Sequence, residues 1–118
     1  MKLLIVDDSM LIRRSIERHL SQDTFSEIHS AADGLLAIKE FKTFMPDVVT
    51  LDITMPRMDG ITAMEEMLRL KPDTKIMIVS ALSDEATAID ALIKGAEQFI
   101  CKPFTGEELA QALREMLS

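Results

Sequence analysis

The sequence predicts a doubly wound α/β fold, in which helices cover both faces of a five-stranded parallel sheet. Apolar runs of strand length alternate with segments of helical periodicity along the whole chain. Such runs are typical of strands buried on both faces, and parallel strands need helical crossovers between them. At 118 residues, the chain has the size of one compact domain with room for a single site.

Strand and helix patterns follow one another five times. The strand-like runs extend over Lys2 to Val6, Ser26 to Ala31, Asp47 to Leu51, Lys75 to Val79, and Gln98 to Cys101. The helical segment after the first run carries Ile12, Ile16 and Leu20 at four-residue spacing, which places an apolar stripe on one side of a helix. The last segment has the same kind of stripe, so both helices can lie on a sheet.

Residues that begin or end helices stand at the expected places. Asp33 precedes the second helical segment, and the pair Ser83–Asp84 precedes the fourth. Thr105 and Glu108 have the spacing of a capping box at the start of the fifth segment. Gly95 is placed to end the fourth.

Right-handed crossovers with helices on both faces favour, for five strands, the flavodoxin-like order 2-1-3-4-5. In such sheets ligands bind beyond the carboxyl ends of the strands, where the strand order reverses. Asp7 and Asp8 follow the first strand and Asp52 follows the third. Ser80 and Lys102 follow the fourth and fifth strands, so we expect all five side chains to converge on one site.

The chemistry of this set indicates a metal and a phosphoryl group. Three close carboxylates repel one another, which raises at least one pKa unless a cation neutralises them. Oxygen ligands alone favour Mg²⁺, which binds through one or two carboxylates and phosphoryl oxygens. Lys102 and Ser80 add a positive charge and a hydroxyl donor. Any one acid alone is better explained as solvated or helix-capping, as for Asp8 with Ser9; the coincidence at four strand ends favours a shared site.

The composition argues against two classes of partner, nucleic acids and membranes, and for a cytoplasmic location. The net charge is −7, and the 13 Lys and Arg are scattered among 20 acids, which argues against nucleic-acid binding. The longest apolar stretches have strand length and the N-terminus has no signal-peptide pattern, so we expect a cytoplasmic protein without membrane contact. No long heptad pattern is visible, and we expect a monomer.

Four segments, in this order and spacing, resemble the receiver domain of two-component response regulators. They are Leu4 to Ser9, Asp47 to Gly60, Ile78 to Ala81, and Lys102 to Phe104. The resemblance extends over essentially the whole chain, residues 1–118, so one receiver domain without an output domain is expected. The sequence around Asp52 is most similar to that of the single-domain chemotaxis-type receivers.

The resemblance implies that Asp52 is the phosphoacceptor, which attacks a phosphohistidine on a sensor histidine kinase and forms an aspartyl phosphate. Asp7, Asp8 and Asp52 would hold Mg²⁺ together with the backbone carbonyl of Thr54. Slow self-hydrolysis would end the signal. The protein is therefore expected to be a signalling phosphoprotein, not an enzyme that acts on other substrates.

The resemblance also implies how the signal leaves the site. Lys102, before a cis peptide bond to Pro103, would pair with the phosphoryl group, and Ser80 would hydrogen-bond to it. Phe99 matches the family's switch aromatic, which would change a surface on the fourth helix, fifth strand and fifth helix that a downstream target binds. A phosphatase is a further candidate partner. Phe99 lacks the hydroxyl of the frequent Tyr, and plain core packing is the alternative role for it.

Two other functions fit part of the pattern. A phosphatase of the haloacid-dehalogenase type also uses a strand-end Asp with Mg²⁺, but it needs a second Asp where this chain has Thr54. A receiver-like module that binds a partner without phosphorylation would be insensitive to Asp52→Asn. Gly60 is expected to relieve a tight backbone before the third helix, since glycine can adopt a positive φ.

Overall fold

The computed structural model describes residues 1–20, 24–55, 57–81 and 85–118. Its elements are β1 (Lys2–Val6), α1 (Met10–Leu20), β2 (Glu27–Ala31), α2 (Gly34–Phe44), β3 (Val48–Asp52), α3 (Gly60–Leu70), β4 (Lys75–Ala81), α4 (Glu85–Lys94), β5 (Gln98–Lys102) and α5 (Gly106–Leu117). Strands and helices alternate from the first element to the last, which confirms the predicted βα rhythm.

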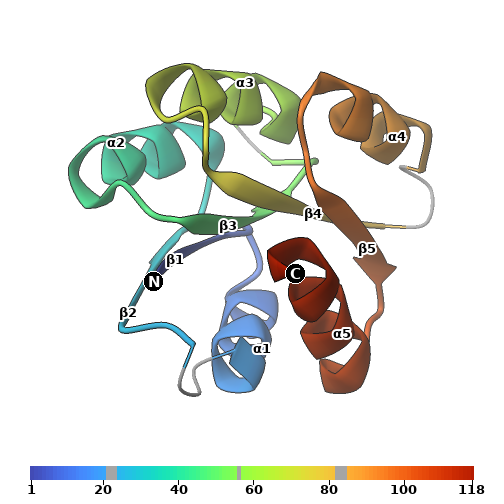
Figure 1. The fold of residues 1–118 in the computed structure, drawn as a ribbon. Helices are drawn as coiled ribbons and strands as arrows, with labels where there is room; N and C mark the ends of the chain where they lie inside the picture. Colours follow the sequence, from blue (N-terminus) through green and yellow to red (C-terminus); the bar gives the residue numbers. More distant parts are fainter. Residues whose placement is uncertain (21–23, 56, 82–84) are drawn as a thin grey trace.

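The five strands form one parallel sheet in the order β2-β1-β3-β4-β5. In Figure 1, α2, α3 and α4 lie on one side of this sheet, and α1 and α5 lie on the other. The predicted flavodoxin-like topology is confirmed. Because β1 and β3 are neighbours in the middle of the sheet, their carboxyl ends meet where the strand order reverses.

Each face of the sheet has its own core. Side chains alternate between the two faces along a strand. Leu4 and Val6 of β1 therefore belong to the core beneath α2, α3 and α4, whereas Leu3 and Ile5 belong to the core beneath α1 and α5. All residues of β3 are buried, as expected for the central strand of a parallel sheet covered on both faces.

The predicted helix signals are confirmed where the structure describes them. Asp33 caps α2 by accepting a backbone N–H of the first turn at 2.9 Å. Thr105 and Glu108 form the capping box of α5. Gly95 follows α4 with a φ of 129°, a conformation that glycine adopts readily at helix ends. The predicted signal at 83–84 lies outside the described residues.

The strand ends differ from the prediction in a way that matters for the site. β3, β4 and β5 each run one or two residues further, so that Asp52, Ala81 and Lys102 are their last residues. Since the strand register continues to these residues, the ladder holds the backbone there. β2 begins one residue later than predicted, at Glu27.

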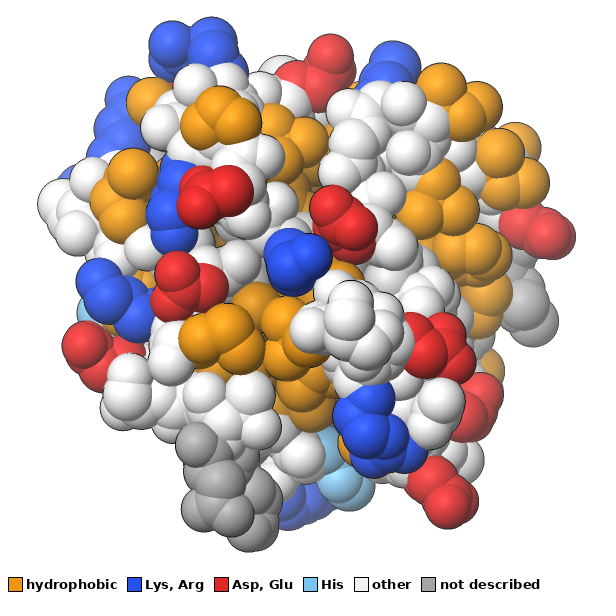
Figure 2. All heavy atoms as spheres, in the orientation of Figure 1, with side chains coloured by type: hydrophobic (Ala, Val, Ile, Leu, Met, Phe, Trp, Pro, Cys, Tyr) orange, Lys and Arg blue, Asp and Glu red, His pale blue; other side chains and the backbone are white. Residues whose placement is uncertain are grey.

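Charged side chains are dispersed over the surface. On the face that Figure 2 shows, Lys and Arg lie among Asp and Glu without a continuous basic band. Apolar side chains gather over α4 in the same view, where Ile89 and Ile93 are 47% and 79% exposed. In the described part of the chain, no helix has the length and apolar composition to cross a bilayer.

Candidate functional site

β1 delivers two adjacent carboxylates to the carboxyl edge of the sheet. Asp7 is fully buried, whereas Asp8 is exposed. The backbone N–H of Asp7 donates to the carbonyl of Ala31 at 3.2 Å, and its carbonyl accepts from the guanidinium of Arg13 at 2.7 Å. Asp7 Oδ1 also accepts the N–H of Ser9 at 2.9 Å. These bonds hold Asp7 in one position at the end of the strand.

Ser9 caps α1, so this role does not fall to Asp8. The Ser9 hydroxyl accepts the backbone N–H of Ile12 at 3.3 Å, which is the N-cap position of the helix. A carboxylate oxygen of Asp8 lies within 4.8 Å of carboxylate oxygens from both Asp7 and Asp52. The capping explanation therefore accounts for Ser9 and leaves Asp8 in the acidic cluster.

β3 delivers the third carboxylate. Asp52 is 5% exposed, and its Oδ1 accepts the backbone N–H of Thr54 at 3.2 Å. The start of α3 lies directly against this strand end, where the N–H of Gly60 donates to the carbonyl of Ile53 at 2.7 Å. A Cβ at Gly60 would lie 2.4 Å from the carbonyl oxygen of Asp52. The predicted tight backbone at Gly60 is present, but it is a close approach of two backbone segments and not a positive φ.

β4 and β5 bring a hydroxyl and an ammonium to the same edge. The Lys102 Nζ lies 2.8 Å from Asp7 Oδ2 and 3.6 Å from Asp52 Oδ2. Ser80 is fully buried, and its hydroxyl has no hydrogen-bond partner among the described residues. Buried hydroxyls are normally hydrogen-bonded, so this one is available for a group that enters the site. The Lys102–Pro103 peptide bond is cis.

The electrostatics of the site are dominated by burial and by like charges. Burial, together with the neighbouring carboxylate of Asp7, raises the pKa of Asp52 to about 6, and the positive charge of Lys102 offsets this rise only in part. For Lys102, burial alone would lower the pKa, but the ion pairs with Asp7 and Asp52 raise it. Lys102 therefore stays charged at neutral pH, and the carboxylate of Asp52 is held in an unfavourable environment.

The donor set fits a divalent cation such as Mg²⁺. Three carboxylates share a single ammonium, so the cluster carries excess negative charge in a largely buried place. Hard oxygen donors without histidine or cysteine match the preference of Mg²⁺ over the softer metals. A divalent cation would remove the repulsion that raises the pKa of Asp52.

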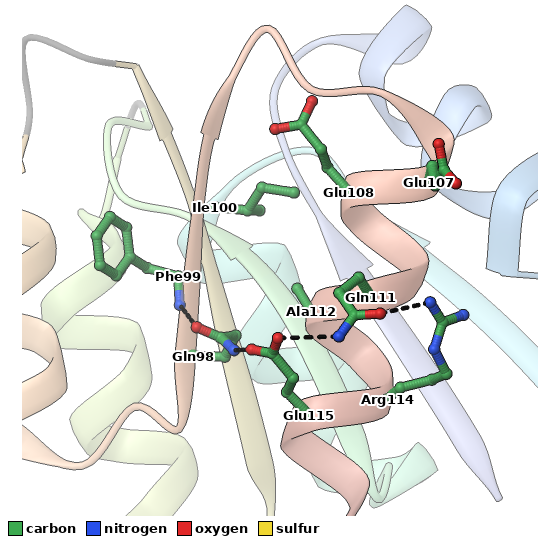
Figure 3. A pocket seen from close by; sticks show the side chains of 9 residues that line it. All are labelled: Gln98, Phe99, Ile100, Glu107, Glu108, Gln111, Ala112, Arg114 and Glu115. Atoms are coloured by element: carbon green, nitrogen blue, oxygen red, sulfur yellow. Dashed lines mark hydrogen bonds between the residues drawn. The ribbon is translucent and has the colours of Figure 1, made fainter.

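Phe99 lies away from this cluster, on β5. Its side chain is half-buried and packs against the core beneath α2, α3 and α4. Figure 3 shows its ring pointing away from α5 and from a groove that runs between β5 and α5. The groove has a volume of about 530 Å³ and carries three glutamates, Glu107, Glu108 and Glu115.

Sequence reasoning missed one pair of residues at the edge of the site. The guanidinium of Arg57 donates to Asp33 Oδ2 from Nε at 3.0 Å and from Nη2 at 2.7 Å. Asp33 was predicted only as a helix cap, and Arg57 was assigned no role. Nothing in the local sequence pattern indicates that these two residues, which are 24 positions apart, are in contact. Only the tertiary structure reveals the contact.

Known proteins of the same length are similar to this chain. The chemotaxis protein CheY of Listeria monocytogenes is 40% identical over 115 residues, which cover 98% of this chain and 97% of that protein. The chemotaxis protein CheY of Bacillus subtilis is 38% identical over 117 residues, covering 99% and 98%.

Solved structures share the fold and the sequence pattern. A chain of the CheX–CheY–BeF₃–Mg²⁺ complex from Borrelia burgdorferi has a TM-score of 0.92 and 36% identity, covering all of this chain and 90% of its own. The receiver domain of NtrX from Brucella abortus has a TM-score of 0.90 and 30% identity, with 98% and 97% covered. The family model of the response regulator receiver domain matches residues 3–114. The chain therefore belongs to the response regulator receiver family, the phosphoacceptor signalling modules of two-component systems.

Proposed function

We propose that this receiver accepts a phosphoryl group on Asp52 from a sensor histidine kinase, in a Mg²⁺-dependent reaction, and signals through altered protein contacts in a chemotaxis pathway. The observation that carries the proposal is the meeting of three carboxylates with the Lys102 ammonium and the unpartnered Ser80 hydroxyl. The relatives named as chemotaxis proteins support the pathway.

Asp52 acts as the nucleophile of the transfer. One of its carboxylate oxygens forms a bond to phosphorus while the bond from phosphorus to the kinase's histidine nitrogen breaks, and that nitrogen leaves with the electron pair. Lys102, which is charged and lies 3.6 Å from the Asp52 carboxylate, neutralises an incoming phosphoryl oxygen. The Ser80 hydroxyl donates to another. Catalysis is then mostly positioning and charge neutralisation.

Asp7, Asp8, Asp52 and the backbone carbonyl of Thr54 are the proposed Mg²⁺ ligands. Mg²⁺, when bound, supplies positive charge to the carboxylates and to the transferred phosphoryl group. The N–H of Thr54 already donates to Asp52 Oδ1, which holds this part of the loop beside the phosphoacceptor. The Mg²⁺ and BeF₃ named for the B. burgdorferi complex support the assignment.

The face of α4, β5 and α5 is the proposed output surface. Ser80 of β4 pairs in register with Cys101, two residues beyond Phe99 on β5, so a shift of the Ser80 hydroxyl toward a phosphoryl group can reach the aromatic ring through adjacent strands. Phosphorylation then favours one of two arrangements of Phe99. To make that arrangement the dominant one, the phosphoryl group has to stabilise it over the other by a few kcal/mol. The CheX–CheY complex supports a CheX-type protein as a further partner beside the target.

The experiment that tests the proposal compares the last residue of β3, Asp52, with Asp47, which directly precedes the strand. The purified protein, Asp52→Asn and Asp47→Asn are incubated with acetyl phosphate, with Mg²⁺ or with EDTA, and their intact masses are recorded. We expect the wild type and Asp47→Asn to gain one phosphoryl group only with Mg²⁺, and Asp52→Asn to gain none.

Two results would contradict the proposal. Phosphoryl addition to Asp52→Asn would place the acceptor at another residue. A partner that binds Asp52→Asn and the wild type equally, with or without acetyl phosphate, would indicate a phosphorylation-independent binding module.

A further inference from the structure

Arg57 and Asp33 join two separate parts of the chain beside the acidic cluster. Asp33 stands at the start of α2, and its side chain is 11% exposed. Its Oδ1 accepts the backbone N–H of Leu36, while its Oδ2 accepts both hydrogen bonds from Arg57. The Leu36 N–H and the Arg57 guanidinium hold the pKa of the Asp33 carboxyl below its usual range, so this carboxylate is charged at neutral pH.

Arg57 has a backbone conformation that is unfavourable for its residue type. Its φ is 69°, in the left-handed region that residues with a Cβ rarely adopt. Such conformations persist where surrounding contacts hold them, and they cluster at functional sites. The two hydrogen bonds to a nearly buried carboxylate are contacts of this kind.

The segment held by this pair connects the phosphoacceptor to α3. It contains Thr54, whose N–H donates to Asp52 Oδ1. On the α2 side it lies so close to the helix start that a Cβ at Gly34 would be 2.3 Å from the carbonyl oxygen of Met58. The Arg57 side chain is 53% exposed, and in the described part of the chain its hydrogen bonds go to Asp33 and not to the acidic cluster, so its effect on the site has to act through the backbone between β3 and α3.

We propose that the Arg57–Asp33 pair is a positioning clamp that holds the described residues between β3 and α3 (53–55 and 57–59), and with them the Thr54 backbone, in place for the metal and the phosphoryl group. This inference rests on the proposed function for its purpose. Residues that support metal ligands without touching the metal commonly change the affinity by about 10–100-fold when they are replaced. The clamp also gives a reason for an arginine at a position whose φ would suit glycine.

The test uses two variants that each remove the clamp but satisfy the local backbone. Arg57→Gly keeps the positive φ without strain, and Asp33→Ser keeps a side chain that can cap α2. We expect each variant, and the double variant, to raise the Mg²⁺ dissociation constant about tenfold in isothermal titration calorimetry. In the metal-free protein, amide hydrogen exchange at Thr54 is expected to become faster. Arg57→Lys is expected to recover part of the affinity.

Arg69→Ala is the matched control, because Arg69 forms an exposed pair with Glu66 on the surface of α3. It should leave the Mg²⁺ affinity unchanged. The inference would be overturned if both clamp variants kept the wild-type Mg²⁺ affinity and the wild-type rate of amide exchange at Thr54. It would also be overturned if the loss of Mg²⁺ affinity in the double variant equalled the product of the losses in the two single variants, because the two residues would then act independently. Failure of the wild type to take up a phosphoryl group at Asp52 would count against the proposed function alone, since titration and exchange do not use phosphorylation.

Discussion

Two aspartates, one directly before β3 and one at its end, are in opposite electrostatic situations. At the amino end, Asp47 accepts the backbone N–H of Lys2 at 2.8 Å and pairs with the Lys71 ammonium at 3.1 Å. The Lys2 N–H and Lys71 lower the pKa of Asp47, despite partial burial. At the carboxyl end, burial and the carboxylate of Asp7 raise the pKa of Asp52 to about 6.

The comparison shows that one residue type serves two purposes near the two ends of one strand. The Asp47 carboxylate gains hydrogen bonds and a counter-charge on folding, so it helps to hold the strand ends together. The Asp52 carboxylate loses hydration on folding and gains only one backbone donor and a shared ammonium. Its charge therefore lowers the free energy of unfolding. A divalent cation that neutralises the cluster is therefore expected to bind there and to stabilise the folded protein.

The largest stability effect is expected from Asp52→Asn in metal-free protein. Because the Asp52 carboxyl binds its proton more tightly in the folded state, stability falls as the pH rises from about 4 to about 6 and stays low above that range. Removing the charge is expected to raise the free energy of unfolding by about 2 kcal/mol at pH 7.5. Urea denaturation followed by circular dichroism would measure the gain, which Mg²⁺ should reduce by stabilising the wild type. A loss of stability at pH 7.5 without Mg²⁺ would contradict this account of Asp52.

A smaller effect of opposite sign is expected from Asp47→Ala. The variant leaves the Lys2 N–H and the Lys71 ammonium without their carboxylate, which is expected to cost about 1 kcal/mol, since the Asp47 side chain is partly solvated. The contribution of Asp47 is present above its unfolded pKa and is lost as the pH falls below about 4. The same urea experiment at pH 7.5 and pH 3 measures it. If the loss is equally large at both pH values, the charge of Asp47 is not its cause.

The smallest effect is expected from Thr50→Val, between the two aspartates. Thr50 is fully buried, and its hydroxyl has no partner among the described residues. Replacing an unpaired buried hydroxyl by a methyl group is expected to stabilise the protein by about 1 kcal/mol or less. Phosphorylation by acetyl phosphate should not change, because the unpaired group lies outside the site. Destabilisation would show that the hydroxyl is satisfied in solution, which would weaken the parallel with Ser80.

Local patterns predicted much of the architecture. Apolar strand runs and capping residues such as Asp33 and Thr105 depend on neighbours only a few positions away, which a single sequence displays. The strand ends were less accurate, because Asp52 and Lys102 belong to the ladder through backbone pairing with β4. Hydrogen bonding between strands does not depend on whether a side chain is polar.

The residues of the candidate site were predicted, but the contacts that hold them in place were not. The meeting of Asp7, Asp8 and Asp52 followed from the strand order alone, since parallel strands in this topology end at one edge. A tight backbone at Gly60 was predicted, but its contact with the Asp52 carbonyl was not, because that contact depends on how α3 meets β3. The roles of the site residues, the monomeric state and the lack of an output domain stay predictions.

The sequence by itself determined which residues are apolar, where helices begin, and which chemical groups stand at the strand ends. These properties arise from interactions between residues close in the chain. Only the tertiary structure decided that Lys102 lies nearer to Asp7 than to Asp52, that the Ser80 hydroxyl is left unpaired, and that Arg57 reaches Asp33. Such contacts join distant segments, and their geometry depends on the packing of every element between them.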